Sequence, residues 1–159
     1  MGPQFEELSR RVISSGNSSR EVIAPATGEP LGTVPESTPE DVAEAVETAR
    51  QKQAGWAEVP VEKRAAIIEQ FSEAILSHRE EFLDILQSET GKSRQTALEE
   101  LLDVQASCEY AVDHGPAAIA DEPRSPAISL LSTATVTYDP VGVVGVISPW
   151  NYPLNLAMV

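Results

Sequence analysis

An aromatic ring and a side-chain amide are neighbours in the turn 148–153, Ser-Pro-Trp-Asn-Tyr-Pro. The turn follows an apolar run, residues 141–147, which predicts a strand covered on both faces in a parallel sheet. Ligands of such sheets bind beyond the carboxyl ends of the strands. Trp150 can then supply an apolar wall and Asn151 a fixed donor. The turn also suits a structural role, with Trp150 in the core and Asn151 capping a following helix.

Cys108 is the one cysteine of the chain and the obvious candidate for a nucleophile. It shares an apolar helical stripe with Leu101 and Val112, where a free cysteine usually serves as a small core side chain. A reactive thiol needs an electropositive, accessible setting, and Glu109 is its immediate neighbour. The sequence therefore predicts a structural Cys108, and a single cysteine excludes an intramolecular disulfide.

The remaining polar candidates are assigned to ordinary structural roles. Lys92 follows a predicted helix end, where its charge complements the helix dipole, and the acidic pair 99–100 is interpreted as a solvated helix face. His78 and His114 stand far apart without a nearby cysteine, so no metal site is expected. The glycines of the run 142–145 lie inside the predicted strand and indicate close packing rather than phosphate binding.

Length and charge limit the classes of partner. The 159 residues are 42% hydrophobic and carry a net charge of -14, as suits one globular domain whose acidic surface repels nucleic acid and anionic membranes. The chain contains neither a run of about 20 apolar residues nor the pattern of a secretory signal. We expect no nucleic acid or membrane partner, and a cytoplasmic location.

Helices must position this turn, and their apolar residues recur at helical spacing. Residues 1–20 are polar and are predicted to form a mobile segment. Proline and glycine delimit a predicted hairpin of strands 21–25 and 30–34. Thr38 is the predicted cap of the first helix. The predicted helices are 39–55, 61–78, 80–91 and 94–116, followed by an alternating strand at 132–138, the buried strand 141–147 and the start of a helix at 154–159.

The predicted helices each carry an apolar stripe. The residues expected on these inward faces are Val42, Ala45, Val46 and Ala49, then Ala65, Ile68, Phe71 and Ile75, then Phe82, Ile85 and Leu86, and finally Leu98, Leu101, Leu102, Cys108 and Val112.

The run 140–153, Pro-Val-Gly-Val-Val-Gly-Val-Ile-Ser-Pro-Trp-Asn-Tyr-Pro, resembles the strand and turn that meet the nicotinamide cofactor in aldehyde dehydrogenases. Three earlier segments support the resemblance in the family's order. Residues 24–29 resemble its Asn-Pro-x-Thr-Gly turn, with alanine in place of asparagine. Trp56-Ala57 with residues 64–66 resembles the break between its first helices, and residues 89–92, Glu-Thr-Gly-Lys, resemble the turn after its third helix.

The resemblance implies an α/β fold, of which this chain is the N-terminal part: a hairpin, four helices, a strand of the oligomerisation sheet and the first buried strand of an incomplete Rossmann-like sheet. The implied divisions are a mobile segment 1–20, a first part of the NAD(P)-binding domain at 21–131, an oligomerisation-type strand at 132–140, and the buried strand with the start of a helix at 141–159. The parent protein is expected to be a homodimer or homotetramer.

The resemblance also implies an oxidoreductase that converts an aldehyde to a carboxylic acid with NAD or NADP. In this family a cysteine thiolate attacks the aldehyde, hydride passes to the nicotinamide, and a glutamate helps water release the acid. Asn151 matches the side-chain amide that holds the developing oxyanion. The positions matching the cofactor site are Ser148, Pro149, Trp150 and Asn151. The run 145–153 and residues 122–124 look nearest to succinate-semialdehyde dehydrogenases, with broad-specificity aldehyde enzymes as the alternative.

The family's nucleophile and catalytic glutamate match positions beyond residue 159. We therefore expect the chain to be an inactive fragment of the enzyme. The alternative is a non-catalytic truncated subunit that acts as an interaction module, pairing through the strand 132–138 with complete subunits; such an exposed edge also promotes aggregation.

Overall fold

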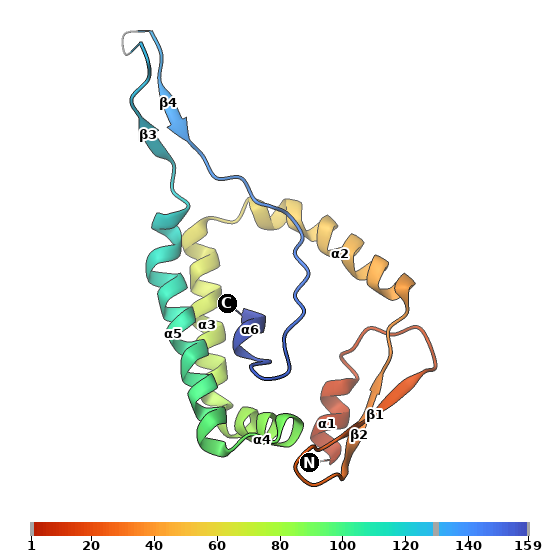
Figure 1. Ribbon diagram of the computed structural model, residues 1–159. Helices are drawn as coiled ribbons and strands as arrows, with labels where there is room; N and C mark the ends of the chain where they lie inside the picture. Colours follow the sequence, from red (N-terminus) through yellow and green to blue (C-terminus); the bar gives the residue numbers. More distant parts are fainter. Residues whose placement is uncertain (1, 129–130, 159) are drawn as a thin grey trace.

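Two long helices, α3 (Val61–Ser77) and α5 (Arg94–Ala118), lie side by side, on the left in Figure 1. The computed structural model describes residues 2–128 and 131–158, with side chains from Phe5 onward. The other elements are α1 (Gly2–Ser9), β1 (Ser19–Ile23), β2 (Pro30–Pro35), α2 (Pro39–Ala57), α4 (Arg79–Thr90), β3 (Glu122–Arg124), β4 (Ala134–Val136) and α6 (Asn155–Met158).

The predicted N-terminal hairpin is confirmed, with β1 and β2 antiparallel. Its connecting turn closes through the Ala24 amide, which donates to Glu29 at 2.8 Å. Ahead of residue 21, where no element was predicted, α1 packs on β2. The Phe5 ring lies so close to Gly32 that a Cβ there would approach it to 2.7 Å. The mobility of residues 1–20 stays a prediction.

Helix α2 begins at the predicted cap. The Thr38 hydroxyl accepts the Asp41 amide at 3.2 Å, and Asp41 returns a bond by accepting the Thr38 amide at 2.7 Å. The Asp41 carboxylate also accepts the amide of Ser15 at 3.1 Å, which ties the N-terminal segment to the helix. The Thr38 amide, together with the bonds from Ser15, lowers the Asp41 pKa from 3.8 to about 2.

The free energy of unfolding should therefore depend on pH through Asp41. A carboxyl group whose pKa is lower in the folded state stabilises the fold above its unfolded pKa, and this contribution disappears as the pH falls from 3.8 toward about 2. We expect Asp41→Asn to be less stable than the wild type at neutral pH, with the difference shrinking across this window. Urea unfolding at several pH values measures it. Asp103→Asn, an exposed carboxylate on α5, is the control; a pH-independent difference would contradict the expectation.

The core lies between α3, α4 and α5. Seven buried residues form it, with Ile68, Phe71, Phe82 and Leu154 packed against them: Ile75, Leu83, Leu86, Ala97, Leu101, Val104 and Cys108. The predicted inward stripes of α3 and α4 are largely confirmed. On α5 the core side is confirmed at Leu101 and Cys108 but wrong at Leu98 and Leu102, which are exposed.

Helix ends agree with the sequence except at one point. Helix α4 ends at Gly91, which takes a left-handed conformation with φ 73° and donates its amide to Gln87 at 2.9 Å. Helix α5 was predicted to end at residues 115–116 but continues to Ala118. Pro116 lies in its last turn, so the proline does not end the helix where the sequence predicted.

The segment after α5 forms a second antiparallel hairpin, β3 with β4, which projects away from the helices (Figure 1). The predicted strand at 132–138 is thus present in shortened form. Its partner, with Pro123 opposite Thr135, was not predicted. The Tyr138 hydroxyl donates to Glu122 at 2.8 Å and strengthens the base of this hairpin.

The predicted buried strand at 141–147 is wrong for this structure. The segment forms no regular element, and the side chains of Val141 and Ile147 are 96% and 99% exposed. A parallel strand requires neighbours for its hydrogen bonds. In the described residues, both sheets are two-stranded hairpins that offer no place beside this segment. The fold is consequently mostly helical with two small hairpins, and it realises the expected α/β architecture only in part.

Across residues 2–128 and 131–158, no helix combines the length and the apolar character that crossing a bilayer would require.

Candidate functional site

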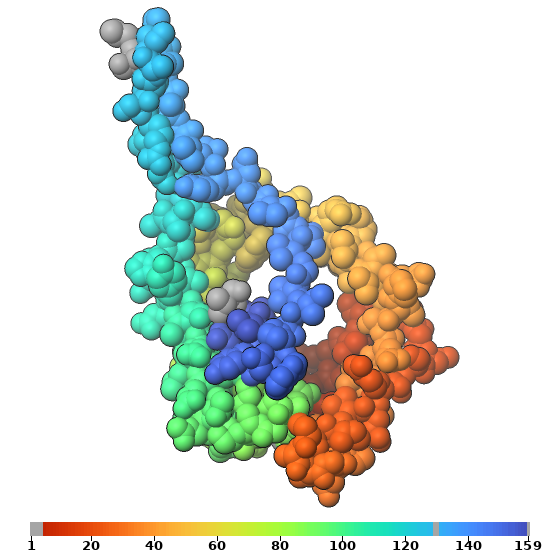
Figure 2. Space-filling view, in the orientation of Figure 1, coloured from red at the N-terminus to blue at the C-terminus, as the bar shows by residue number. Residues whose placement is uncertain are grey.

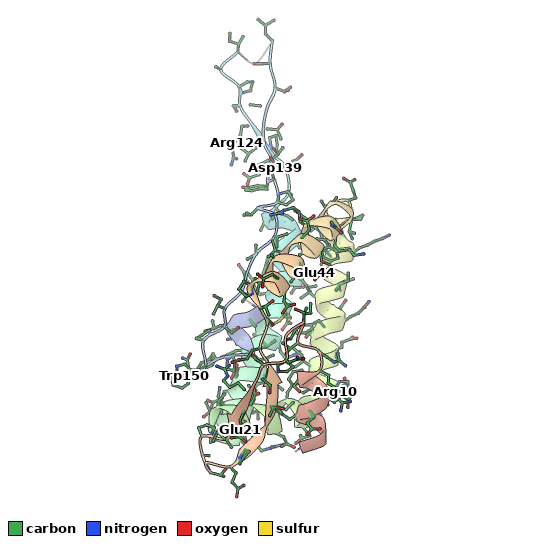
Figure 3. The ribbon with its side chains drawn as sticks, turned by 90° about the vertical axis from the view of Figure 1, so that its right-hand side faces the viewer. Arg10, Glu21, Glu44, Arg124, Asp139 and Trp150 are labelled. Atoms are coloured by element: carbon green, nitrogen blue, oxygen red, sulfur yellow. The ribbon has the colours of Figure 1, made fainter. Side chains whose placement is uncertain are left out.

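The turn 148–153 lies between the segment 141–147 and the short helix α6, which packs against α5. Trp150 is 81% exposed and points away from the helices (Figure 3). Asn151 is also exposed, and α6 begins only at Asn155. The structural interpretation of the turn is therefore wrong: Trp150 is not in the core, and Asn151 does not cap the helix.

Glu100, on α5, caps α6 instead. Its Oε1 accepts the backbone amides of Leu154 at 2.8 Å and Asn155 at 3.1 Å. These are free donors at the start of a helix, and a carboxylate satisfies them well. The Glu100 side chain is completely buried. The prediction that residues 99–100 form a solvated face is wrong at Glu100 and right only at Glu99, which is exposed.

Lys92 joins Glu100 to the turn. Its Nζ forms an ion pair with Glu100 Oε2 and donates to the backbone oxygen of Asn151 at 2.9 Å. The ammonium also lies 4.9 Å from the centre of the Tyr152 ring, within the range of a cation–π interaction. The lysine is only 10% exposed. It was predicted to complement a helix dipole, and the structure shows a different role, because its charge faces a buried carboxylate.

The local sequence explains why these two side chains meet. Gly91 ends α4 in a left-handed conformation and turns the chain toward α5, with Pro25 of the N-terminal hairpin packed against it. Lys92 follows this turn directly, and Ser93 caps α5 by accepting the Thr96 amide at 3.2 Å. Two of the segments that carry the family resemblance, 24–29 and 89–92, therefore pack together, and the second of them contacts the turn through Lys92.

Helical spacing places Glu100 on the buried face of α5. The core residues Ala97, Leu101 and Val104 line this face, and position 100 falls among them. A charge buried to this extent is tolerated only when it is paired and hydrogen-bonded. Glu100 meets this condition with one ammonium and two amides. Its position within an apolar stripe was the sequence signal that could have revealed it.

Cys108 lies in the core and is 5% exposed. Burial raises the pKa of its thiol, which disfavours the nucleophilic thiolate. The predicted structural role agrees with this environment. His78 and His114 are both exposed. Among the described residues, no cluster of three or more metal-ligating side chains is found.

A cavity of about 610 Å³ lies between α2 and the start of the segment 141–147, where the space-filling view is hollowed (Figure 2). Ala49, Trp56 and Val143 are among its mainly apolar lining residues. A second hollow of about 450 Å³ adjoins Val42 and Val46, which were expected to be buried and are exposed. Neither of these two cavities is lined by Trp150 or Asn151.

Comparison with known proteins covers nearly the whole chain. The profile of the aldehyde dehydrogenase family matches residues 12–159. A Mycobacterium ulcerans protein with the provisional name succinate-semialdehyde dehydrogenase (NADP+) 2 is 42% identical over 130 residues, which are 82% of this chain and 25% of that protein. The chain therefore spans about a quarter of the length of that relative.

Solved structures show the same partial coverage. Betaine aldehyde dehydrogenase of Staphylococcus aureus, in complex with NAD+, superimposes with a TM-score of 0.87 at 26% identity over 99% of this chain and 34% of its own. Succinate-semialdehyde dehydrogenase of Burkholderia pseudomallei gives a TM-score of 0.85 at 29% identity over 92% of this chain and 30% of its own.

Proposed function

The chain belongs to the aldehyde dehydrogenase family, and we propose that it forms the N-terminal part of an enzyme that oxidises an aldehyde to a carboxylic acid with NAD or NADP. The observation that carries the proposal is the turn 148–153. Lys92 binds its backbone at Asn151 and Glu100 binds the amide of Leu154 just after it, while the side chains of Trp150 and Asn151 are exposed. A turn fixed in this way presents an amide donor without rearrangement, as transition-state stabilisation requires.

The residues of the turn fit the nicotinamide end of a dinucleotide. Trp150 and Pro149 are exposed apolar groups that can cover a flat ring, and the Ser148 hydroxyl and the Asn151 amide add polar contacts. The cofactor, when bound, accepts the hydride released from the substrate carbon. Among the described residues, the glycines 142 and 145 belong to an extended segment and form no phosphate loop.

In the proposed reaction Asn151 acts at the oxygen of the aldehyde. As the carbonyl carbon is attacked, negative charge develops on this oxygen, and the Asn151 Nδ2 group donates a hydrogen bond to it. The exposed rings of Trp150 and Pro149, beside it in the turn, help to exclude water from the reacting centre. The nucleophile and the general base are assigned to parts of the protein that correspond to family positions beyond residue 159.

We propose succinate semialdehyde as the substrate, because semialdehyde dehydrogenases are among the similar proteins in both sequence and structure. The similar proteins carry both cofactors, with NADP+ in one name and NAD+ in one solved complex. The proposed assembly is a homodimer or homotetramer in the cytoplasm, with the β3–β4 hairpin as its contact. The projection of this hairpin from the helices supports that assignment.

A turnover assay tests whether residues 1–159 lack the groups that the reaction needs besides Asn151. We expect purified residues 1–159 to give no aldehyde-dependent reduction of NAD or NADP, because Asn151 alone cannot form the covalent intermediate. A full-length enzyme that contains this N-terminal part should reduce the cofactor with succinate semialdehyde. Robust turnover by residues 1–159 would contradict the proposal, as would an inactive full-length protein that is folded and binds NAD or NADP.

A further inference from the structure

We infer that Lys92 and Glu100 are positioning residues for Asn151, so that the buried ion pair sets the rate of the reaction without touching the substrate. The inference rests on the proposed function, and it adds the residues that hold the backbone of the Asn151 donor in place. It follows from the contacts of the backbone on both sides of the turn rather than from the side chain of Asn151 itself.

The pair holds the turn at two separate points. Lys92 Nζ binds the carbonyl oxygen of Asn151 at 2.9 Å, and Glu100 Oε1 binds the amides of Leu154 at 2.8 Å and Asn155 at 3.1 Å. The ion pair connects these anchors through Glu100 Oε2. Because both ends of the short stretch 151–155 are held by these contacts, the backbone position from which the Asn151 side chain projects is fixed as well.

Nothing else in the described residues holds the Asn151 backbone by a polar contact. The segment before the turn is exposed and without regular structure, and α6 after it is a single helical turn. A displacement of about 1 Å at a reacting group can cost roughly 10²-fold in rate. The precision of the donor therefore depends on Lys92 and Glu100.

Loss of Lys92 should release the turn before it unfolds the helices. Without the ammonium, the completely buried Glu100 carboxylate has no countercharge. The smallest movement that returns it to water is the lifting of the chain around Leu154 and Asn155, whose amides bind the carboxylate and cover it. In Lys92→Met we therefore expect faster exchange at the turn than in the core.

Hydrogen exchange of residues 1–159 tests the anchor without any activity. We expect Lys92→Met to lose at least about tenfold more protection at the Leu154 and Asn155 amides than at the amide of Val104, in the middle of α5. Lys92→Gln, which keeps a donor, is the milder second variant and should show a smaller change of the same kind. Arg94→Met is the matched control, because Arg94 pairs with Glu80 and Asp84 on the surface. Unchanged protection at the turn, or an equal loss at Val104, would overturn the inference.

Kinetics of the full-length protein test the consequence for the reaction. We expect Lys92→Met to lower kcat by about ten- to a hundredfold with little change in KM for the aldehyde. In the Asn151→Ala background the same substitution should have little further effect, since it acts through Asn151. Equal slowing in both backgrounds would show a general structural role and overturn the inference. If the wild-type protein has no aldehyde activity, the proposed function fails, while exchange still decides whether the pair anchors the turn.

Discussion

Asn151→Ala in the full-length protein should lower kcat for aldehyde oxidation by roughly 10²–10³-fold, the usual cost of removing one oxyanion donor. KM for the aldehyde should change little, because the amide stabilises the developing charge and contributes little to the bound ground state. Steady-state kinetics with succinate semialdehyde and saturating cofactor give both constants. This is the largest effect on activity that we expect from a single substitution in this chain.

The structure makes this substitution a clean test. The anchor of the turn uses the backbone oxygen of Asn151, which alanine retains. The Asn151 side chain is exposed, so its removal creates no cavity. The turn should therefore keep its position while losing only the donor. Unfolding of the variant in urea should match that of the wild type.

Asn17→Ala provides the matched control, because Asn17 is exposed in the loop before β1, far along the chain from the turn. We expect its kcat to equal that of the wild type. A decrease of less than about tenfold in Asn151→Ala, or a rise in KM with kcat unchanged, would show that Asn151 binds the substrate or cofactor rather than the transition state.

The turn 148–153 and the helices around it could be identified from the sequence because their signals are local. Thr38 caps α2 as predicted, and Gly91 ends α4, since both depend on neighbouring backbone groups alone. Proline and glycine likewise predicted the first hairpin, because they act on the local backbone. Local chemistry therefore predicted most element boundaries to within a few residues.

The roles of Lys92 and Glu100 could not be predicted by the same reasoning. Each was interpreted within its own helix or turn, where a lysine suits a helix end and a glutamate suits a solvated face. Their actual role depends on the approach of residues 151–155, more than fifty positions later in the chain. Single-sequence patterns do not report contacts at this separation.

The apolar run 141–147 was misjudged for a different reason. Its apolar composition is typical of a buried strand, but a strand forms only where neighbouring strands complete its hydrogen bonds. The described residues offer none, and Val141, Val144 and Ile147 are exposed. The same holds for Val42 and Leu102, since an apolar stripe shows which face can be buried and not what covers it.

Two adjacent leucines on α5 show the difference between an apolar residue that is buried and one that is not. Both were predicted to face the core, yet Leu101 is 2% exposed within the core cluster and Leu102 is 55% exposed. Leu101→Ala should lower the free energy of unfolding of residues 1–159 by about 2–5 kcal/mol, through lost burial and the cavity it leaves. Leu102→Ala should change it by no more than about 0.5 kcal/mol. Urea unfolding followed by far-UV circular dichroism measures both.

The pair of variants has a further consequence for the turn. Leu101 follows Glu100 directly, and Leu154, whose amide Glu100 binds, packs against the same core cluster. The loss of packing in Leu101→Ala should therefore also weaken the contact of residues 151–155 with α5. Leu102→Ala should leave this contact intact. Equal stabilities of the two variants would mean that the core does not lie where the structure places it. A clear difference would show that the face of α5 that carries Leu101 is the one whose burial stabilises the fold.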